Sequence, residues 1–261
     1  MTTLRVCLWS GPRNVSTALM YSFAQRSDTR VVDEPLYAHY LRVSGVEHPG
    51  REAVLAAHDS NGERVVRRVV LGPCDRPVLF LKQMAHHLVG LERGFLDQTA
   101  NVLLIREPSE VLRSLIRQIA RPRLADTGLA VQAELFDELR RRGQDPPVLD
   151  ARELLLNPRS VLERLCGRLG LAFDEAMLSW PAGPKPEDGV WASHWYQNVH
   201  RSTGFQPYRP KTEPLPEELS SLLEDCRPFY EKLHRVAVRP ESEGDEPLGT
   251  ASGGAPRRKV R

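Results

Sequence analysis

Short apolar runs alternate along this chain with segments whose apolar residues recur at helical spacing. The apolar runs, rich in Val, Ile and Leu, occupy residues 6–9, 30–32, 65–71, 77–81 and 101–105. Helical periodicity is found over residues 15–26, 109–119, 129–142, 158–169 and 217–233. Apolar strands that alternate with helices are typical of a parallel sheet with helices on both faces. The pattern therefore predicts an α/β fold whose ligands bind beyond the carboxyl ends of the strands.

Two segments depart from this alternation. Residues 180–195 are rich in proline, which removes backbone donors and restricts the preceding residue, so an irregular segment is expected there. Residues 240–261 combine Gly, Pro, Ser and charged residues without a periodic apolar face, which is typical of disorder. We therefore predict one α/β domain over residues 1–239, followed by a disordered tail over residues 240–261.

The composition narrows the class of protein. Hydrophobic residues make up 41% and charged residues 27% of the chain, close to the usage of soluble globular proteins. No window approaches the ~20 apolar residues of a membrane span, and the N-terminus leads into a strand-like run rather than a signal peptide. A net charge of +2 is too small to indicate a nucleic-acid partner. We expect a cytoplasmic protein with no membrane span and no nucleic-acid partner.

The four cysteines, Cys7, Cys74, Cys166 and Cys226, are scattered along the chain. They form no CxxC pair and have no histidine at metal-ligand spacing, so we expect buried free thiols and no metal site. The sequence carries no signal for the oligomeric state, and a homo-oligomer remains open.

The first predicted strand ends in a loop that is suited to an anion. Residues 4–23 read LRVCLWSGPRNVSTALMYSF, and the helix in this stretch would present unpaired amides and the positive end of its dipole. Gly11 allows close approach of the backbone, Arg13 supplies a cationic fork, and Ser16 and Thr17 add hydroxyl donors. An ordinary helix cap made by Asn14 or Ser16 is the alternative. The Gly-Lys-Ser/Thr of an ATP-binding loop is absent, which argues against ATP hydrolysis.

This loop resembles the 5'-phosphosulfate loop of sulfotransferases that use 3'-phosphoadenosine 5'-phosphosulfate (PAPS). The usual form is Pro-Lys-Ser-Gly-Thr-Thr, with Arg often replacing Lys in bacterial members. Pro12-Arg13 match the Pro-Lys pair and Ser16-Thr17 match the paired hydroxyls, whereas Asn14-Val15 replace Ser-Gly. The resemblance implies a P-loop NTPase-like three-layer sandwich with a central, mainly parallel sheet. It also implies that PAPS is bound by Gly11, Pro12, Arg13, Asn14, Val15, Ser16 and Thr17.

A second motif stands where this family binds the 3'-phosphate. The family carries an Arg at the end of a later strand and a Ser eight residues on, and the stretch NVLLIREPSEVLRSLI has Arg106 and Ser114 at that spacing. Arg106 follows a strand end, and Pro108 can begin the next helix because its missing amide falls among the unpaired donors. In the alternative, Arg106 only pairs with Glu107 or Glu110.

The resemblance extends over about residues 4–205. Residues 150–178 resemble a stretch of many bacterial sulfotransferases that reads Tyr-Glu-Asp-Leu, then Asn/Asp-Pro, then a helix ending in Leu-Gly-Leu. Residues 201–205 stand where the family has a late basic, glycine-containing loop over the nucleotide. This position implies nucleotide contacts from Arg201, Ser202 and Gly204.

The chemistry of sulfuryl transfer selects the candidate catalytic residues. It requires in-line positioning, stabilisation of the leaving phosphate oxygen, and a base for the acceptor proton. Arg13 is the candidate that neutralises the leaving oxygen. Glu34, in VVDEPLYAHY, resembles the catalytic-base position of some bacterial sulfotransferases. In the alternatives, Glu34 pairs with an arginine of the phosphate loop or binds the acceptor without taking its proton.

The stretch LFLKQMAHHL supplies the competing candidates. Lys82 resembles the lysine of the Lys-x-His segment in cytosolic sulfotransferases, where it helps to hold the transferred sulfuryl group, but Met84 replaces the histidine. His86 and His87 follow, and the histidine pKa suits proton transfer at neutral pH. A structural role is the alternative for both histidines. The aromatic residues within 189–205 form either a hydrophobic lid or core plug, or an acceptor pocket with stacking surfaces.

Three functions follow from these observations. The leading hypothesis is a PAPS-dependent sulfotransferase that acts, without a metal, on a hydroxyl or amine of a small-molecule acceptor. A nucleotide-dependent P-loop kinase is opposed by the missing Gly-Lys pair and Mg²⁺ carboxylate. A non-catalytic nucleotide-binding module is kept open by the missing histidine of the Lys-x-His segment.

Overall fold

The computed structural model describes residues 2–211 and 213–240, and these residues are built around a five-stranded sheet. All neighbouring strands are parallel, and their order is β2-β3-β1-β4-β5. The strands are β1 (Leu4–Ser10), β2 (Thr29–Asp33), β3 (Val78–Met84), β4 (Ala100–Ile105) and β5 (Val148–Asp150). Apart from residue 240, the predicted tail lies outside the described residues, and the division at residue 239 stays a prediction.

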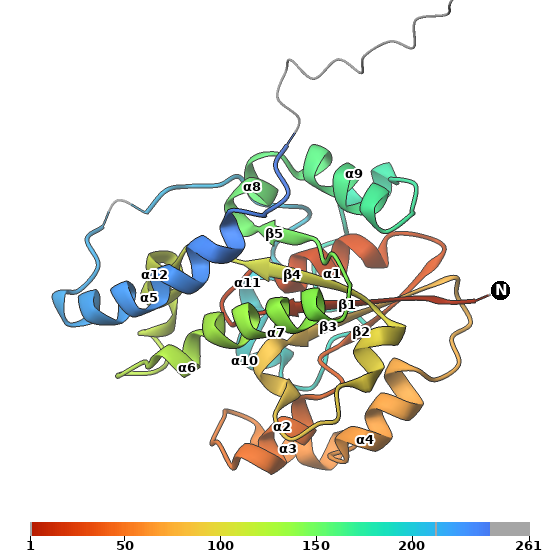
Figure 1. Cartoon of the computed structure of the whole chain (residues 1–261), viewed down its shortest axis with the longest axis horizontal. Helices are drawn as coiled ribbons and strands as arrows, with labels where there is room; N and C mark the ends of the chain where they lie inside the picture. The colour runs from red at the N-terminus through yellow and green to blue at the C-terminus, as the bar shows by residue number, and fades with distance from the viewer. Residues whose placement is uncertain (1, 212, 241–261) are drawn as a thin grey trace, which may run out of the picture.

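Helices cover both faces of the sheet, which confirms the predicted three-layer α/β fold (Figure 1). Alternate residues of β1 point to opposite faces, as the period of a strand requires. Val6 and Leu8 pack with α1 (Ser16–Ala24) and α9 (Pro158–Arg168). Cys7 and Trp9 pack in a second core cluster to which α7 (Leu129–Arg141) and α12 (Ser220–His234) contribute.

The predicted helices are present with shifted ends, and shorter helices join them. The prediction over residues 109–119 corresponds to α5 (Pro108–Leu115), which begins at its proline. Further helices are α2 (Tyr37–Ser44), α3 (Arg51–Ala57), α6 (Leu124–Thr127), α8 (Ala151–Leu156), α10 (Ala192–Trp195) and α11 (Gln197–His200). Single 3-10 turns occupy Ala85–Leu88, Gly94–Gln98, Glu175–Leu178 and Glu217–Leu219. The proline-rich segment is irregular up to α10.

The strand predicted over residues 65–71 is wrong, because this segment is helical. It consists of α4 (Gly62–Val65) followed by a π-helical turn, Val66–Val70. Asn61 caps α4 by accepting a hydrogen bond from the Arg64 amide. Val66 and Val70 pack in the core four residues apart, so the valines fit a helix as well as a strand.

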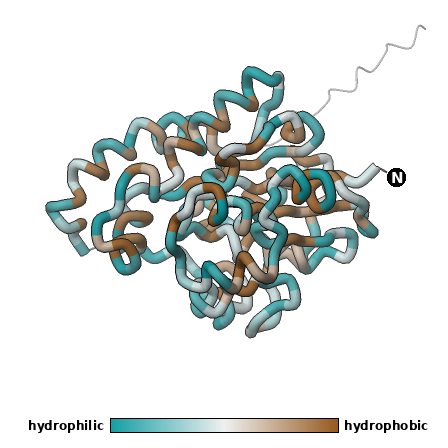
Figure 2. Tube along the Cα trace, turned by 90° about the horizontal axis from the view of Figure 1, so that it is seen from below, coloured by the Kyte–Doolittle hydropathy of each residue, from teal (hydrophilic) through white to brown (hydrophobic). Residues whose placement is uncertain are grey.

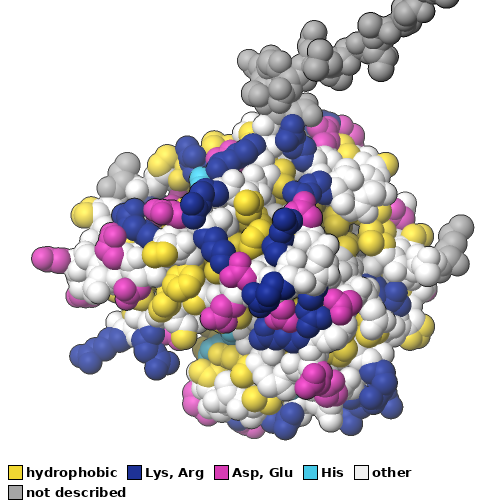
Figure 3. Space-filling view, viewed as in Figure 1, with side chains coloured by type: hydrophobic (Ala, Val, Ile, Leu, Met, Phe, Trp, Pro, Cys, Tyr) yellow, Lys and Arg dark blue, Asp and Glu magenta, His cyan; other side chains and the backbone are white. Residues whose placement is uncertain are grey.

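The surface agrees with the small net charge of the chain. Figure 2 shows hydrophobic stretches running through the middle of the molecule and hydrophilic turns at its periphery. In Figure 3, basic and acidic side chains are interspersed over the face that carries α7 and α12. The four cysteines are free; Cys7, Cys166 and Cys226 are buried and Cys74 is half-buried. Within the described ranges, no helix is long and apolar enough to span a membrane, and no group of three His, Cys, Asp or Glu residues could hold a metal ion.

Candidate functional site

The loop between β1 and α1 has an unusual backbone. Arg13 adopts a left-handed conformation with φ +59°, a region that non-glycine residues rarely occupy. Val15 stands at the N-cap of α1 but makes no side-chain cap. Asn14 braces the loop instead: its side chain accepts a hydrogen bond from the Val15 amide at 2.9 Å and donates one to the Leu104 carbonyl of β4 at 2.9 Å. The cap that Asn14 or Ser16 would make is therefore absent.

The start of α1 consequently offers donors to an anion. No described residue accepts a hydrogen bond from the amides of Ser16 or Thr17. Such unpaired amides, with the positive end of the helix dipole, favour negative charge. Both residues lie in the first turn, as the sequence predicted for the phosphate loop.

Gly11 brings the phosphate loop against the turn between α6 and α7. A Cβ at Gly11 would lie 2.5 Å from the Thr127 carbonyl oxygen, so only glycine fits. A Cβ at Gly128 would lie 3.1 Å from Cα of Gly11 and 3.5 Å from Cδ of Pro12. Gln132 of α7 then ties two strands together by donating to the carbonyls of Trp9 and Leu104.

The two predicted phosphate motifs lie in contact. Nε of Arg13 donates to Oγ of Ser114 at 2.8 Å, and Nη1 of Arg106 donates to the Arg13 carbonyl at 2.9 Å. Arg106 also pairs with Glu110 at 2.8 Å, so the alternative pairing is present beside the contact with the loop. Because β1 and β4 are neighbours, residues about a hundred positions apart meet at one edge of the sheet.

Several cations gather around this contact. The pKa of Arg13 is lowered by burial and by the neighbouring charges of Arg106 and Arg117. The pKa of Lys211 is lowered by burial and by the same two arginines. The lowered pKa values show that these positive charges repel one another, and an anion that binds between them stabilises them.

A second cluster is built around Lys82, and the side chain of this lysine is 1% exposed. Its ammonium donates to Oδ1 of Asp33 at 2.9 Å, to Oε1 of Glu34 at 2.6 Å and to the hydroxyl of Tyr196 at 2.5 Å. Although burial alone would lower it, the pKa of Lys82 is raised well above its usual value by Asp33 and Glu34. All three ammonium protons are engaged, so Lys82 acts on Glu34 in this arrangement rather than on a free ligand.

Glu34 directly follows the carboxyl end of β2 and is held in a strained conformation. Its φ is +37°, and its amide donates to the Lys82 carbonyl at 2.9 Å. Burial raises the pKa of Glu34; Lys82 lowers it and Asp33 raises it further. A carboxyl whose pKa is moved toward neutrality has the property that a general base needs. Glu34 pairs with Lys82 and not with a phosphate-loop arginine.

The two histidines lie beside this cluster in an aromatic stack. His87 is buried and stacks on Tyr37 and Tyr40, with ring centroids 5.1 Å and 4.8 Å away. Burial lowers the pKa of His87 well below its usual value, and burial together with His48 lowers the pKa of His86 to about 4. Both rings are therefore neutral near pH 7, and their packing favours a structural role.

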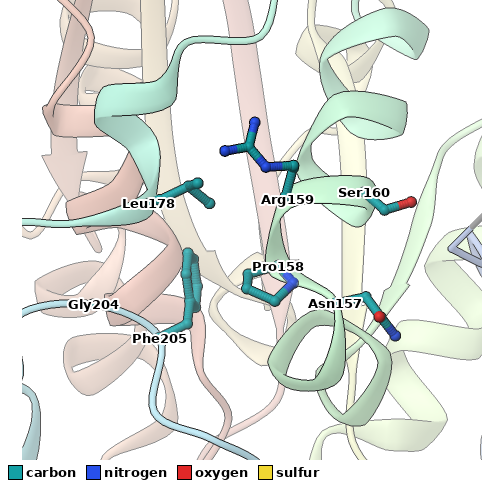
Figure 4. A pocket seen from close by; sticks show the side chains of 7 residues that line it. All are labelled: Asn157, Pro158, Arg159, Ser160, Leu178, Gly204 and Phe205. Carbon is teal, nitrogen blue, oxygen red and sulfur yellow. The ribbon is translucent and has the colours of Figure 1, made fainter.

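The late loop, residues 201–205, makes its described contacts with neighbouring segments and not with the phosphate loop. Arg201 is exposed and bonds to Asn198, whereas the Ser202 hydroxyl donates to the Val199 carbonyl and accepts from Trp180. Gly204 forms an isolated bridge with Ser179. Next to it lies an open pocket of about 400 Å³, where Leu178, Pro158 and Phe205 face one another (Figure 4). No described contact joins Arg201, Ser202 or Gly204 to the phosphate loop, and their nucleotide contacts stay predictions.

Sequence reasoning missed two residues of the lysine cluster. Asp33 was passed over beside Glu34, and Tyr196 was counted only among the aromatic residues of 189–205. Tyr196 and Trp191 are 5% and 1% exposed, so these two rings are core and not an open stacking surface. An acidic residue next to the candidate base, and a tyrosine within a buried aromatic segment, were the available signals.

Comparison with known proteins shows the family of this chain. A family model described as "Sulfotransferase domain" matches residues 4–237. Two curated relatives from Arabidopsis thaliana are similar over most of the chain: "Branched-chain-amino-acid aminotransferase-like protein 1" is 39% identical over 241 residues, and "Branched-chain-amino-acid aminotransferase-like protein 2" is 38% identical over 226 residues. The matches cover 92% and 86% of this chain but 43% and 40% of those relatives.

Solved structures share the fold at low identity. A sulfotransferase domain from the curacin biosynthetic pathway matches with a TM-score of 0.51 and 16% identity, over 92% of this chain and 99% of the other. A sulfotransferase from Alicyclobacillus acidocaldarius matches with a TM-score of 0.52 and 12% identity, over 92% and 98%. These likenesses support the P-loop-like α/β fold, and the family match confirms the resemblance found in the motifs. The chain belongs to the sulfotransferase domain family.

Proposed function

We propose that this chain is a PAPS-dependent sulfotransferase that transfers the sulfuryl group to a hydroxyl or amine of a small-molecule acceptor. Family membership supports the reaction class. The contact of Arg13 with Ser114 and Arg106 supports the choice of donor, because the two motifs predicted to bind phosphate meet at one edge of the sheet. A cytoplasmic location and the oligomeric state stay predictions.

The residues present fit a nucleotide that carries a phosphate group at each of two positions. The unpaired amides of Ser16 and Thr17 suit the 5' end, and Arg106 with Ser114 suits the 3' end. Arg13 lies between these groups. Among the described contacts, its guanidinium donates one hydrogen bond, from Nε to the Ser114 hydroxyl. Its remaining guanidinium nitrogens are the natural partners of a bridging phosphate oxygen.

The proposed chemistry uses groups from the two clusters. Arg13 and the loop amides neutralise the phosphate oxygen that leaves as its bond to sulfur breaks. Glu34 accepts the proton of the acceptor hydroxyl or amine as the new bond to sulfur forms. Lys82 orients the Glu34 carboxylate through the 2.6 Å hydrogen bond. No step in this scheme requires a metal.

Calorimetry distinguishes this donor from ATP. We expect the protein to bind adenosine 3',5'-bisphosphate without Mg²⁺, and Arg106→Ala to weaken binding about 10- to 100-fold, since a hydrogen bond to a charged group is worth about 1.5–3 kcal/mol. Arg227→Ala is the matched control, because Arg227 is half exposed on α12 and, among the described residues, pairs with Glu224. A preference for ATP with Mg²⁺ would refute the proposal in favour of a kinase.

Turnover is tested separately with labelled PAPS and a metabolite extract. Transfer of label to a small molecule, lost in Glu34→Gln and kept in His87→Asn, supports the proposed enzyme and its base. Bisphosphate binding without any transfer of label would instead identify a non-catalytic nucleotide-binding module.

A further inference from the structure

The segment from Gly189 to Tyr196 is joined to the sheet through buried polar contacts. The hydroxyl of Tyr196 accepts a hydrogen bond from Lys82, accepts one from Nε1 of Trp191 at 3.1 Å, and donates one to Oδ2 of Asp33 at 2.7 Å. The Gly189 amide donates to the same Oδ2 at 3.3 Å. Groups from β2, β3 and this late segment therefore converge on one buried point.

We propose that Asp33 and Tyr196 are positioning residues, which hold the Lys82 ammonium between them and thereby set how it meets the Glu34 carboxylate. The inference rests on the proposed function, because it assigns these residues to the same base. It adds that the late segment, through Tyr196, helps to fix the Lys82 ammonium that orients Glu34, the proposed base.

Burial explains why Asp33 acts through Lys82 and not on a substrate. The Asp33 side chain is 1% exposed, and both of its oxygens are engaged: Oδ1 with Lys82, and Oδ2 with Tyr196 and Gly189. A buried carboxylate with both oxygens engaged is anchored, since each broken bond would leave a polar group unpaired. Glu34, at 7% exposed, retains more contact with solvent.

The charges of the cluster do not cancel. Two carboxylates face one ammonium, and the other titratable groups that face Glu34 and Lys82 are uncharged near neutral pH. Tyr21 contributes from α1, Tyr37 from α2 and Tyr196 from the late segment, and burial raises the pKa of all three phenols. His58 interacts with Asp33, and burial lowers its pKa. His87 contributes from the turn after β3, and burial keeps it neutral. Beyond the effect of burial, the ionisation of Glu34 therefore depends on how Asp33 and Glu34 share Lys82.

Asp188, directly before the late segment, makes a second anchor, which supplies a matched control. The Tyr21 hydroxyl donates to Oδ1 of Asp188 at 2.6 Å, and Oδ2 of Asp188 lies 2.8 Å from Nε2 of His200. Tyr21→Phe thus removes a phenol-to-aspartate bond beside this segment and breaks no described hydrogen bond of the lysine cluster. The Tyr21 phenol interacts with Asp33 and Lys82, but burial and Asp188 raise its pKa, so the substitution changes no charge near the cluster. A general loosening of the segment would affect Tyr21→Phe and Tyr196→Phe alike.

The test is a pH titration of the Glu34 carboxyl carbon by NMR in protein labelled with 13C at the glutamate carboxyl, with the resonance identified by its loss in Glu34→Gln. In Asp33→Asn, Lys82 loses its competing carboxylate, and we expect the pKa of Glu34 to fall by at least one unit, a tenfold change in its ionisation constant. In Tyr196→Phe, Lys82 loses a competing acceptor and is held more closely by Glu34, so we expect the pKa of Glu34 to fall by at least half a unit, about threefold. In Tyr21→Phe we expect the wild-type value.

An unchanged Glu34 titration in folded Tyr196→Phe, or an equal shift in Tyr21→Phe, would overturn the inference. Because Tyr196→Phe keeps the ring and all charges, it decides the matter even where Asp33→Asn does not fold. Adenosine 3',5'-bisphosphate is added in parallel, and its affinity is expected to stay within twofold of wild type in each variant. If the wild-type protein does not bind the bisphosphate, the proposed function is refuted. The NMR titration needs no nucleotide, so it tests the positioning of Glu34 independently.

Discussion

Replacing Lys82 with methionine tests the lysine cluster as a structural unit. Methionine fills much of the same space but carries no charge, so Asp33 and Glu34 lose their shared ammonium at 2.9 Å and 2.6 Å. The Tyr196 hydroxyl also loses its donor at 2.5 Å. The variant thus leaves two adjacent buried carboxylates without a described cation.

The expected cost is large for a single substitution. Removing one partner of a buried ion pair typically destabilises a protein by about 3–5 kcal/mol. For a domain of this size each kcal/mol lowers the melting temperature by about 2–4 °C, so a decrease of roughly 10 °C is expected. The matched control is Lys232→Met: Lys232 and Asp137 are 38% and 43% exposed, and such a pair is worth about 0–1 kcal/mol.

The destabilisation should also depend on pH. Burial already raises the pKa of Glu34, and loss of Lys82 raises it further above the unfolded value of about 4.3. A carboxyl with a raised folded pKa destabilises the fold above that pKa, and the penalty disappears as the pH falls through it. Urea unfolding of both variants at pH 8 and pH 5 measures this. A cost below about 1 kcal/mol at pH 8, or the same cost at pH 5, would refute the buried-charge argument.

Two further predictions concern the phosphate loop. Gly11→Ala places a methyl group 2.5 Å from the Thr127 carbonyl oxygen, so it should lower the free energy of unfolding in urea by about 1–3 kcal/mol and weaken bisphosphate binding. The control is Gly167→Ala in α9, where nothing lies within 4 Å of the added Cβ, and it should be neutral or stabilising. Equal costs in the two variants would contradict the steric argument. Arg13→Gly should be about 1 kcal/mol more stable than Arg13→Ala, because glycine tolerates φ +59°, although both lose phosphate binding. An alanine variant as stable as the glycine variant would show that the backbone is not strained.

The fold could be predicted because its signals are local. The runs 6–9 and 101–105 lie within buried parallel strands, and the run 77–81 enters one at its second residue; strands of this kind are apolar throughout. The strand prediction for residues 65–71 failed because paired valines around two arginines fit both a strand and a helix. The run is also too short for its length to distinguish the two. The strand Val148–Asp150 was missed because three residues are too few to show a period.

The candidate site could be predicted only in part. Arg13, Ser114, Lys82 and Glu34 were singled out because their motifs resemble those of sulfotransferases and three of them lie near strand ends, where ligands bind in such folds. That Arg13 contacts Ser114 and that Lys82 pairs with Glu34 was not predicted. The bond between Asp33 and Tyr196 spans 163 positions, and no local pattern indicates it. The environment of the histidines was equally invisible, since burial by Tyr37 and Tyr40 is a property of packing and not of sequence.

Backbone strain and candidate chemistry coincide in this chain. Apart from glycines, the described residues with left-handed φ are Arg13 and Glu34, and such conformations cost about 1–3 kcal/mol each. Each is held by the candidate residue of the neighbouring strand: Arg106, which follows β4, binds the Arg13 carbonyl after β1, and the Lys82 carbonyl of β3 accepts the Glu34 amide after β2. The strand order β2-β3-β1-β4 thus places two such pairs side by side at the carboxyl edge. Loss of the Arg106 side chain is therefore expected to disturb both the position and the charge around Arg13, because the bond to the Arg13 carbonyl comes from the guanidinium. Loss of the Lys82 side chain removes the charge beside Glu34 but keeps the backbone bond to the Glu34 amide.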